Sequence, residues 1–164
     1  NQFGNDANWL SHYETTAPEI WEQTGGEITA FVAGMGTSGT LMGVARRFKE
    51  YDPTIQIVGA EPIFGHAIQG LKNMKEAIVP DIYDRKRLDR VITVEDRPAF
   101  AMTERLAIEE GLFCGMSSGA AVVAALEVAA DLSPADTVVA ILPDRGDRYL
   151  STALFRSICG QCPP

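Results

Sequence analysis

The sequence predicts an α/β fold of three layers, in which a mostly parallel sheet is covered by helices on both faces. Four short apolar, β-rich segments are separated by segments of helical pattern, and this alternation implies crossover connections between parallel strands. A sheet built in this way buries both of its faces under helices. The predicted strands are residues 28–33, 55–60, 90–94 and 137–142.

The predicted helices fill the intervals around these strands. The first has the form of a capping box, with Thr16 as the N-cap, Pro18 in the first turn and Glu19 three residues after the cap. The stretch 61–88 shows no sustained period and is predicted to be a long functional loop. The predicted helices are residues 17–23, 41–51, 98–110 and 118–130, a terminal helix from about 149, and a shorter one within 5–13.

Composition and charge limit the classes of function. The 164 residues, 46% of them hydrophobic, can form one core, and no linker or repeat divides the chain, so residues 1–164 are assigned to a single α/β domain. The net charge of −8 argues against a nucleic-acid partner. No apolar run reaches the roughly 20 residues that a membrane helix needs. We therefore expect a cytoplasmic protein without a nucleic-acid or membrane partner.

Several reactive residue types carry no predicted role. Three cysteines form no even disulfide framework, and Cys159 and Cys162 make a lone C-x-x-C that is interpreted as incidental, so no metal site is predicted. Cys114 is interpreted as a small buried hydrophobe. His12 is assigned to a helix face without a ligand role. Asp144 and Asp147 are interpreted as solvated acids in a turn, with a place at the mouth of the site as the alternative.

The most informative segment is residues 34–40, Gly-Met-Gly-Thr-Ser-Gly-Thr, which follows a predicted strand and opens a predicted helix. Glycines let the backbone turn sharply and bring its N–H groups close to a ligand, and the helix start adds unpaired donors and the positive end of a dipole. Three hydroxyl residues, Thr37, Ser38 and Thr40, add side-chain donors. The segment is therefore predicted to bind a phosphate group.

The residues alone leave two interpretations of this loop open. Gly34, Gly36 and Gly39 have the spacing of a dinucleotide fingerprint, and Glu61 lies about 20 residues further on, where a ribose-binding acid belongs. The many hydroxyls argue against a dinucleotide, and so does a second small-residue turn, 115–119, that opens another helix. A serine cap and close helix packing explain that second turn equally well.

Three spaced motifs, with matching segments around them, occur in the order seen in a known family. The matching segments are residues 1–3, 12–16, 18–21, 31–40, 115–121 and 148–152. This pattern resembles the cysteine synthases, that is, the O-acetylserine and O-phosphoserine sulfhydrylases with their cystathionine β-synthase relatives. These enzymes have the fold type II of pyridoxal-phosphate enzymes. The resemblance covers roughly their C-terminal half, which is most of their larger domain.

The resemblance implies a site for pyridoxal 5'-phosphate. In the family, Ser117 would face the pyridine nitrogen, and a neutral hydroxyl there fits elimination and replacement at the β-carbon. A hydroxyl residue at Ser38, where the family more often has glycine, favours the B-type branch. The residues that would hold the cofactor's phosphate are Gly36, Thr37, Ser38, Gly39 and Thr40.

Two parts of the family's active site are missing from this chain. The family has its Schiff-base lysine in a Ser-x-Lys motif and binds the substrate carboxylate with a Thr-Ser-Gly-Asn-Thr-Gly loop, and neither occurs here. None of the lysines present has that context; they are Lys49, Lys72, Lys75 and Lys86. The chain is therefore predicted to be the C-terminal part of a longer two-domain enzyme, inactive without its N-terminal half and a homodimer when complete.

The loop 66–74 corresponds to the substrate side in the family, so Gly70 and Lys72 are predicted substrate contacts. Some members with a basic residue near the position of Lys72 accept O-phosphoserine. A cation there would compensate the charge of a phosphate leaving group or of an anionic sulfur donor. The alternative is a solvated surface lysine.

The chain is predicted to be part of a pyridoxal-phosphate-dependent transferase of the cysteine synthase type. Its amino-acid substrate would be O-acetylserine or O-phosphoserine, and sulfide or another sulfur donor would replace the β-substituent to give cysteine. A fragment of a cystathionine β-synthase or of a serine/threonine dehydratase is the alternative within the fold. A dinucleotide-binding Rossmann domain or a regulatory module is the alternative of another class.

Overall fold

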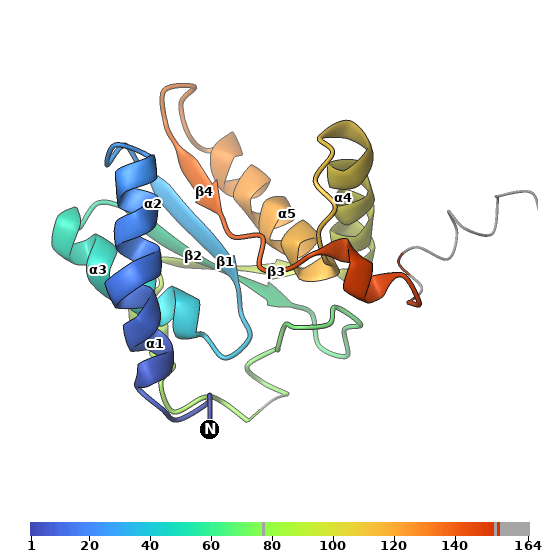
Figure 1. The fold of residues 1–164 in the computed structure, drawn as a ribbon, viewed down its shortest axis with the longest axis horizontal. Coiled ribbons are helices and arrows are strands. Elements are labelled where there is room, and N and C mark those ends of the chain that lie inside the picture. The colour runs from blue at the N-terminus through green and yellow to red at the C-terminus, as the bar shows by residue number, and fades with distance from the viewer. Residues whose placement is uncertain (77, 153, 155–164) are drawn as a thin grey trace, which may run out of the picture.

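The computed structural model describes residues 1–76, 78–152 and 154, and it has the α/β architecture that the sequence predicts (Figure 1). All strand pairings are parallel, and the four strands form one sheet in the order β3-β2-β1-β4. Their carboxyl ends therefore share one edge, where ligands bind in sheets of this kind. The strands are β1 (Ala30–Gly34), β2 (Gln56–Pro62), β3 (Arg90–Val94) and β4 (Val138–Ala140).

Helices lie on both faces of the sheet, with α1 to α3 on one side and α4 and α5 on the other (Figure 1). None of the helices in the described part of the chain combines the length and the apolarity that a membrane span requires. The helices are α1 (Ala7–Ser11), the π-helical η1 (His12–Thr16), α2 (Ala17–Gln23), α3 (Gly39–Tyr51), α4 (Asp96–Glu109) and α5 (Met116–Ala130), with the 3-10 turns η2 (Arg85–Arg87) and η3 (Gly146–Tyr149).

Alternate side chains of the central strand β1 pack into two separate cores. Phe31 and Ala33 join the core under α3, whereas Val32 joins the core under α5. Successive strand side chains point to opposite faces, so a strand that is apolar throughout must be covered on both sides. This packing accounts for the three-layer arrangement.

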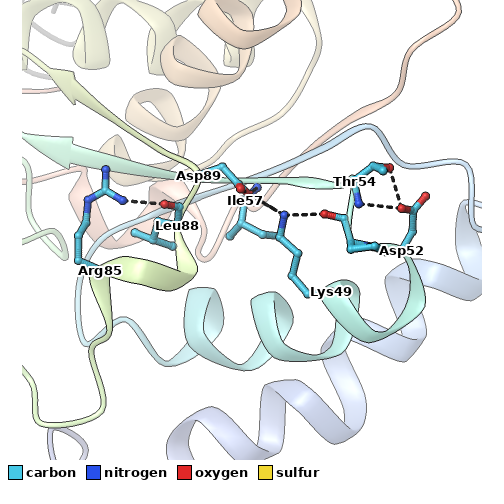
Figure 2. A network of polar contacts seen from close by, with 8 residues as sticks. Lys49, Asp52, Thr54, Ile57, Arg85, Leu88 and Asp89 are labelled. Atoms are coloured by element: carbon cyan, nitrogen blue, oxygen red, sulfur yellow. Dashed lines mark hydrogen bonds and ion pairs between the residues drawn. The ribbon is translucent and has the colours of Figure 1, made fainter.

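A polar network fixes the C-terminal end of α3 to the sheet (Figure 2). The Lys49 ammonium donates to the carbonyl of Pro53 at 3.0 Å and pairs with Asp89 at 2.9 Å. Asp89 also accepts a hydrogen bond of 2.7 Å from the backbone N–H of Ile57. These contacts lie at the amino ends of β2 and β3, at the edge of the sheet opposite the glycine loop, so Lys49 has a structural role.

The expected capping box at Thr16 is wrong. Thr16 has helical backbone angles (φ −59°, ψ −46°) and its side chain caps no backbone N–H, because the chain is already helical through α1 and η1 before α2 begins. Its hydroxyl instead lies 2.9 Å from Nδ1 of His12. The separate short helix expected within 5–13 is α1, which runs directly into the π-helical turn.

The C-terminal part differs from the expectation in two places. The expected strand 137–142 is shortened to β4, because β1 pairs with it only over the three residues Val138–Ala140. After β4 the chain forms the short turn η3 before the expected helix start at about 149. Most of that expected helix lies outside the described residues, as do Cys159 and Cys162.

Candidate functional site

The glycine loop connects β1 to α3 through a strained residue and two close approaches. Ser38 has φ 68°, and among the described residues it alone combines a positive φ with a side chain. A Cβ on Gly36 would lie 2.8 Å from the carbonyl oxygen of Gly70, and one on Gly39 would overlap the amide of Asn8. Glycine is therefore required at both positions, because neighbouring segments pack against the bare backbone.

The hydroxyl groups of this loop differ in their partners. Thr37 Oγ1 accepts a hydrogen bond of 3.2 Å from the Asn8 amide, and Thr40 Oγ1 lies 3.3 Å from Nε2 of His12. Ser38 is only 4% exposed, and its Oγ has no hydrogen-bond partner. A buried hydroxyl without a partner is costly, so Ser38 is a position where a polar group of a ligand would be stabilising.

One cavity of about 610 Å³ joins the predicted site residues. It lies at the carboxyl edge of the sheet, where the loops after β1, β2 and β4 come together with the start of α5. Its lining includes all of the predicted positions, which are Gly36, Thr37, Ser38, Gly39, Thr40, Gly70, Lys72 and Ser117. Residues that are far apart in the chain are thus brought to one place.

Ser117 lies in the first turn of α5 and lines the same cavity as the glycine loop. It is 4% exposed, and a Cβ on Gly70 would lie 3.9 Å from its Oγ. The backbone N–H of Gly115 donates to the carbonyl of Asp144 at 3.2 Å and so joins the start of α5 to the loop after β4. The helix start thus presents a hydroxyl to the cavity from a fixed position.

Of the two interpretations of Asp144, the structure supports a place in the lining of the cavity and not that of a solvated turn acid. The hydroxyl of Tyr149 donates to Asp144 Oδ2 at 2.6 Å, whereas Asp144 Oδ1 is buried without a partner, and both residues line the cavity. Burial and the adjacent carboxylate raise the pKa of Tyr149 from 10.0 to about 12, so the phenol stays protonated and remains a donor at neutral pH. The signal available in the sequence was a tyrosine shortly after an acid at the end of a predicted strand.

The loop after β2 reaches the cavity at Gly70 and Lys72. The backbone N–H of Lys72 donates to the carbonyl of Met35 at 2.7 Å, which attaches this loop to the glycine loop. The Lys72 ammonium lies 5.2 Å from the centroid of the Phe3 ring. Among the described residues, Lys72 is the one lysine that lines the cavity.

The Glu61 carboxylate stabilises the loop that follows it in the chain. Its Oε1 accepts a hydrogen bond of 2.8 Å from the backbone N–H of Met74, and the neighbouring Asn73 side chain donates to the carbonyl of Pro62 at 2.8 Å. A ribose-binding acid would need its carboxylate open to the ligand. This arrangement argues against the dinucleotide interpretation.

Comparison with known proteins gives matches along most of the chain. Residues 1–144 match the family model described as pyridoxal-phosphate dependent enzyme. A cysteine synthase B of Pseudomonas aeruginosa is 50% identical over 155 residues, which are 94% of this chain and 52% of that protein. The crystal structure of a cysteine synthase from Entamoeba histolytica matches with a TM-score of 0.86 and 40% identity over 94% of this chain and 48% of that one. An O-acetylserine dependent cystathionine beta-synthase from Helicobacter pylori gives a TM-score of 0.87 and 40% identity over 94% and 52% of the two chains.

The chain belongs to the family of pyridoxal-phosphate dependent enzymes, because the family model matches residues 1–144. The parallel sheet, with its glycine loop and serine at one cavity, agrees with this assignment. Within that class, its resemblance to the cysteine synthases is confirmed by the relatives above. The chain spans about half the length of the curated relatives that it matches, as in the 52% coverage of the Pseudomonas protein.

Proposed function

We propose that this chain is the C-terminal part of a cysteine synthase, which replaces the β-substituent of O-acetylserine or O-phosphoserine with sulfide or another sulfur donor. The observation that carries the proposal is the single cavity shared by the glycine loop, Ser117 and Lys72. The reaction needs the N-terminal half, because the chain lacks the family's Schiff-base lysine. The complete enzyme is proposed to be a cytoplasmic homodimer.

The residues of the cavity fit pyridoxal 5'-phosphate. The partnerless Ser38 hydroxyl and the start of α3 offer donors to a phosphate, and the five residues 36–40 are assigned to it. Ser117, which lines the same cavity, offers a neutral hydroxyl to the pyridine nitrogen. The cofactor, when bound, supplies an electron sink for the substrate's α-carbon.

Lys72 is assigned to the negative charge of the leaving group or of the sulfur donor, and Gly70 to the same substrate side. In the described part of the chain the Lys72 ammonium forms no ion pair, and its neighbour is the ring of Phe3. A cation held against an aromatic face keeps its donors available for an anion. This supports a role in binding rather than a solvated surface position.

Titration with pyridoxal 5'-phosphate and, separately, with NAD tests the cofactor. The absorbance of the cofactor and the fluorescence of Trp9 and Trp21 report binding. We expect saturable binding of pyridoxal 5'-phosphate that inorganic phosphate competes away, and weaker binding to a Ser117→Ala variant. Saturable binding of NAD, with none of pyridoxal 5'-phosphate, would refute the proposal in favour of a dinucleotide-binding module.

Selectivity tests Lys72 in the chain joined to its N-terminal half. Lys72→Ala is expected to lower kcat/KM for O-phosphoserine relative to O-acetylserine by about tenfold or more, the effect of one lost charge-assisted hydrogen bond. Lys75→Ala is the matched control, because Lys75 is exposed and does not line the cavity. An unchanged ratio in Lys72→Ala would end the assignment.

A second candidate function is that of a cystathionine β-synthase. The Helicobacter pylori structure, described as an O-acetylserine dependent cystathionine beta-synthase, favours it because its fold and identity are as similar as those of the cysteine synthase structure. A competition between sulfide and a thiol amino acid as sulfur donors separates the two in the joined enzyme. We expect sulfide to be preferred.

A further inference from the structure

We propose that His12 is a positioning residue of the phosphate-binding loop, whose Nε2–H donates to Thr40 Oγ1 and so directs the Thr40 hydroxyl proton into the cavity. The inference rests on the proposed function of this loop and adds a residue to it. Thr40 lines the cavity, whereas His12 lies behind it. His12 therefore acts through Thr40 and not on a ligand directly.

The imidazole lies between two hydroxyl groups. Its Nδ1 is 2.9 Å from Thr16 Oγ1, and its Nε2 is 3.3 Å from Thr40 Oγ1. Both ring nitrogens thus have one hydroxyl partner each, and the three side chains form a line from the outer helix to the cavity. The expectation that His12 is a helix-face residue without a role omitted this contact.

The two tautomers of a neutral imidazole have opposite effects on Thr40. A neutral ring has one donor and one acceptor nitrogen. If Nε2 accepts, the Thr40 proton points toward His12, and only hydroxyl lone pairs face the cavity, where they repel an anion. If Nε2 donates, Thr16 donates to Nδ1, and the Thr40 proton is available to a phosphate oxygen. A bound phosphate therefore selects the tautomer protonated at Nε2.

The fold holds His12 in reach of Thr40 through Gly43. A Cβ on Gly43 would lie 2.7 Å from the Cβ of His12 and would overlap the carbonyl of Trp9, so only glycine lets η1 pack this closely on α3. Thr40 lies three residues before Gly43 and hence on the same face of α3. The π-helical turn, in which Ala17 N–H donates to the carbonyl of His12, belongs to the same segment.

The surroundings favour a neutral His12. Burial lowers the pKa of its imidazole, and that desolvation is the cause of the shift. On the facing helix α3, Arg47 pairs with Glu50 at 3.2 Å, and the Tyr13 hydroxyl of η1 donates to the same carboxylate. The charged or titratable groups of the packed elements are Tyr13 and Glu14 on η1, Glu19 and Glu22 on α2, and Arg46, Arg47, Lys49, Glu50 and Tyr51 on α3; α1 carries none.

Nitrogen-15 NMR of the histidines tests the tautomer in this chain directly. The sequence has two histidines, and His66→Gln removes the second signal. We expect His12 to be neutral and protonated at Nε2 when inorganic phosphate or pyridoxal 5'-phosphate is bound. A His12 protonated at Nδ1 in the bound state would overturn the inference, and this measurement needs no substitution at His12.

Binding of the same two probes tests the role of the contact. His12→Leu is expected to weaken both by about tenfold, as for the loss of one hydrogen bond that orients a donor to a charged group. His12→Gln is expected to recover most of the affinity, because its amide N–H can replace Nε2–H. In a Thr40→Val background, His12→Leu should not weaken the binding of either probe further, since the two residues act through one contact.

The outcomes separate this inference from the proposed function. A wild-type chain that binds neither phosphate nor pyridoxal 5'-phosphate would end both. A wild-type chain that binds them, with a folded His12→Leu variant of equal affinity, would overturn the role of His12 and leave the proposed function standing. Circular dichroism establishes that each variant is folded.

Discussion

Tyr149→Phe tests whether the part of the cavity wall made by Asp144 and Tyr149 is held by a charge-assisted hydrogen bond. The substitution removes the hydroxyl that donates to Asp144 Oδ2 at 2.6 Å and leaves the ring in place. The Asp144 carboxylate already has one buried oxygen without a partner. Loss of this donor therefore leaves a half-buried carboxylate without a side-chain donor, which is unfavourable.

The pKa of the phenol sets only an upper limit on the effect, because burial, the largest cause of the shift, contributes no hydrogen-bond energy. A rise from 10.0 to about 12 corresponds to at most about 2.7 kcal/mol of preference for the protonated form. The open side of the cavity lets solvent screen part of this interaction. We therefore expect Tyr149→Phe to lower the free energy of unfolding by about 1–2 kcal/mol at neutral pH, within the range for a hydrogen bond to a charged group.

The pH dependence has a defined sign. The pKa of Tyr149 is higher in the folded chain than its ordinary value, so the stabilisation is fully present below about pH 10 and is lost as the pH rises through about 12. The difference in stability between wild type and Tyr149→Phe should accordingly be constant up to about pH 10 and then shrink.

Urea unfolding followed by circular dichroism from pH 7 to strongly alkaline pH measures this difference. Tyr51→Phe is the matched control, because Tyr51 is 39% exposed and its hydroxyl donates to no group in the described part of the chain. The reasoning is refuted if Tyr149→Phe is as stable as Tyr51→Phe at pH 7, or if the difference does not shrink above pH 10.

Two further substitutions have outcomes set by packing. Gly36→Ala places a Cβ 2.8 Å from the carbonyl oxygen of Gly70, so we expect titration to show loss of pyridoxal 5'-phosphate binding with unchanged far-ultraviolet circular dichroism. Phe48→Ala removes a fully buried ring that packs edge-on against Phe31 at 5.6 Å. Denaturant unfolding should show a loss of about 3–5 kcal/mol, against about 0.5 kcal/mol or less for Leu126→Ala at an exposed position.

The fold was predictable because its signals are local and repeated. The four strands are short apolar runs between breakers, and 90–94 has the same bounds as β3. Strand ends depend on the partner, which is why the run 137–142 pairs over only three residues. The capping motif at Thr16 failed because a four-residue pattern does not reveal that the preceding turn is already helical.

The parts of the candidate site that could be predicted are those formed by residues adjacent in the sequence. The glycine loop and the turn at Ser117 could be recognised one by one, and both line the cavity. The contact between His12 and Thr40 joins side chains 28 residues apart, and it exists because a helix packs on bare backbone at Gly43. No local pattern encodes such a contact, since it depends on how two elements are placed in space.

The position of β4 in the sheet sets an order of assembly for the cavity. Thr137 contacts Thr29 across 108 residues of chain, whereas β1, α3 and β2 follow one another directly. Contacts that close long loops form more slowly because they carry a larger entropy cost. The glycine loop can therefore form with its immediate neighbours, and the Asp144 and Tyr149 wall joins only when β4 docks. The wall that Asp144 and Tyr149 form thus depends on the pairing of β4 with β1, which spans three residues.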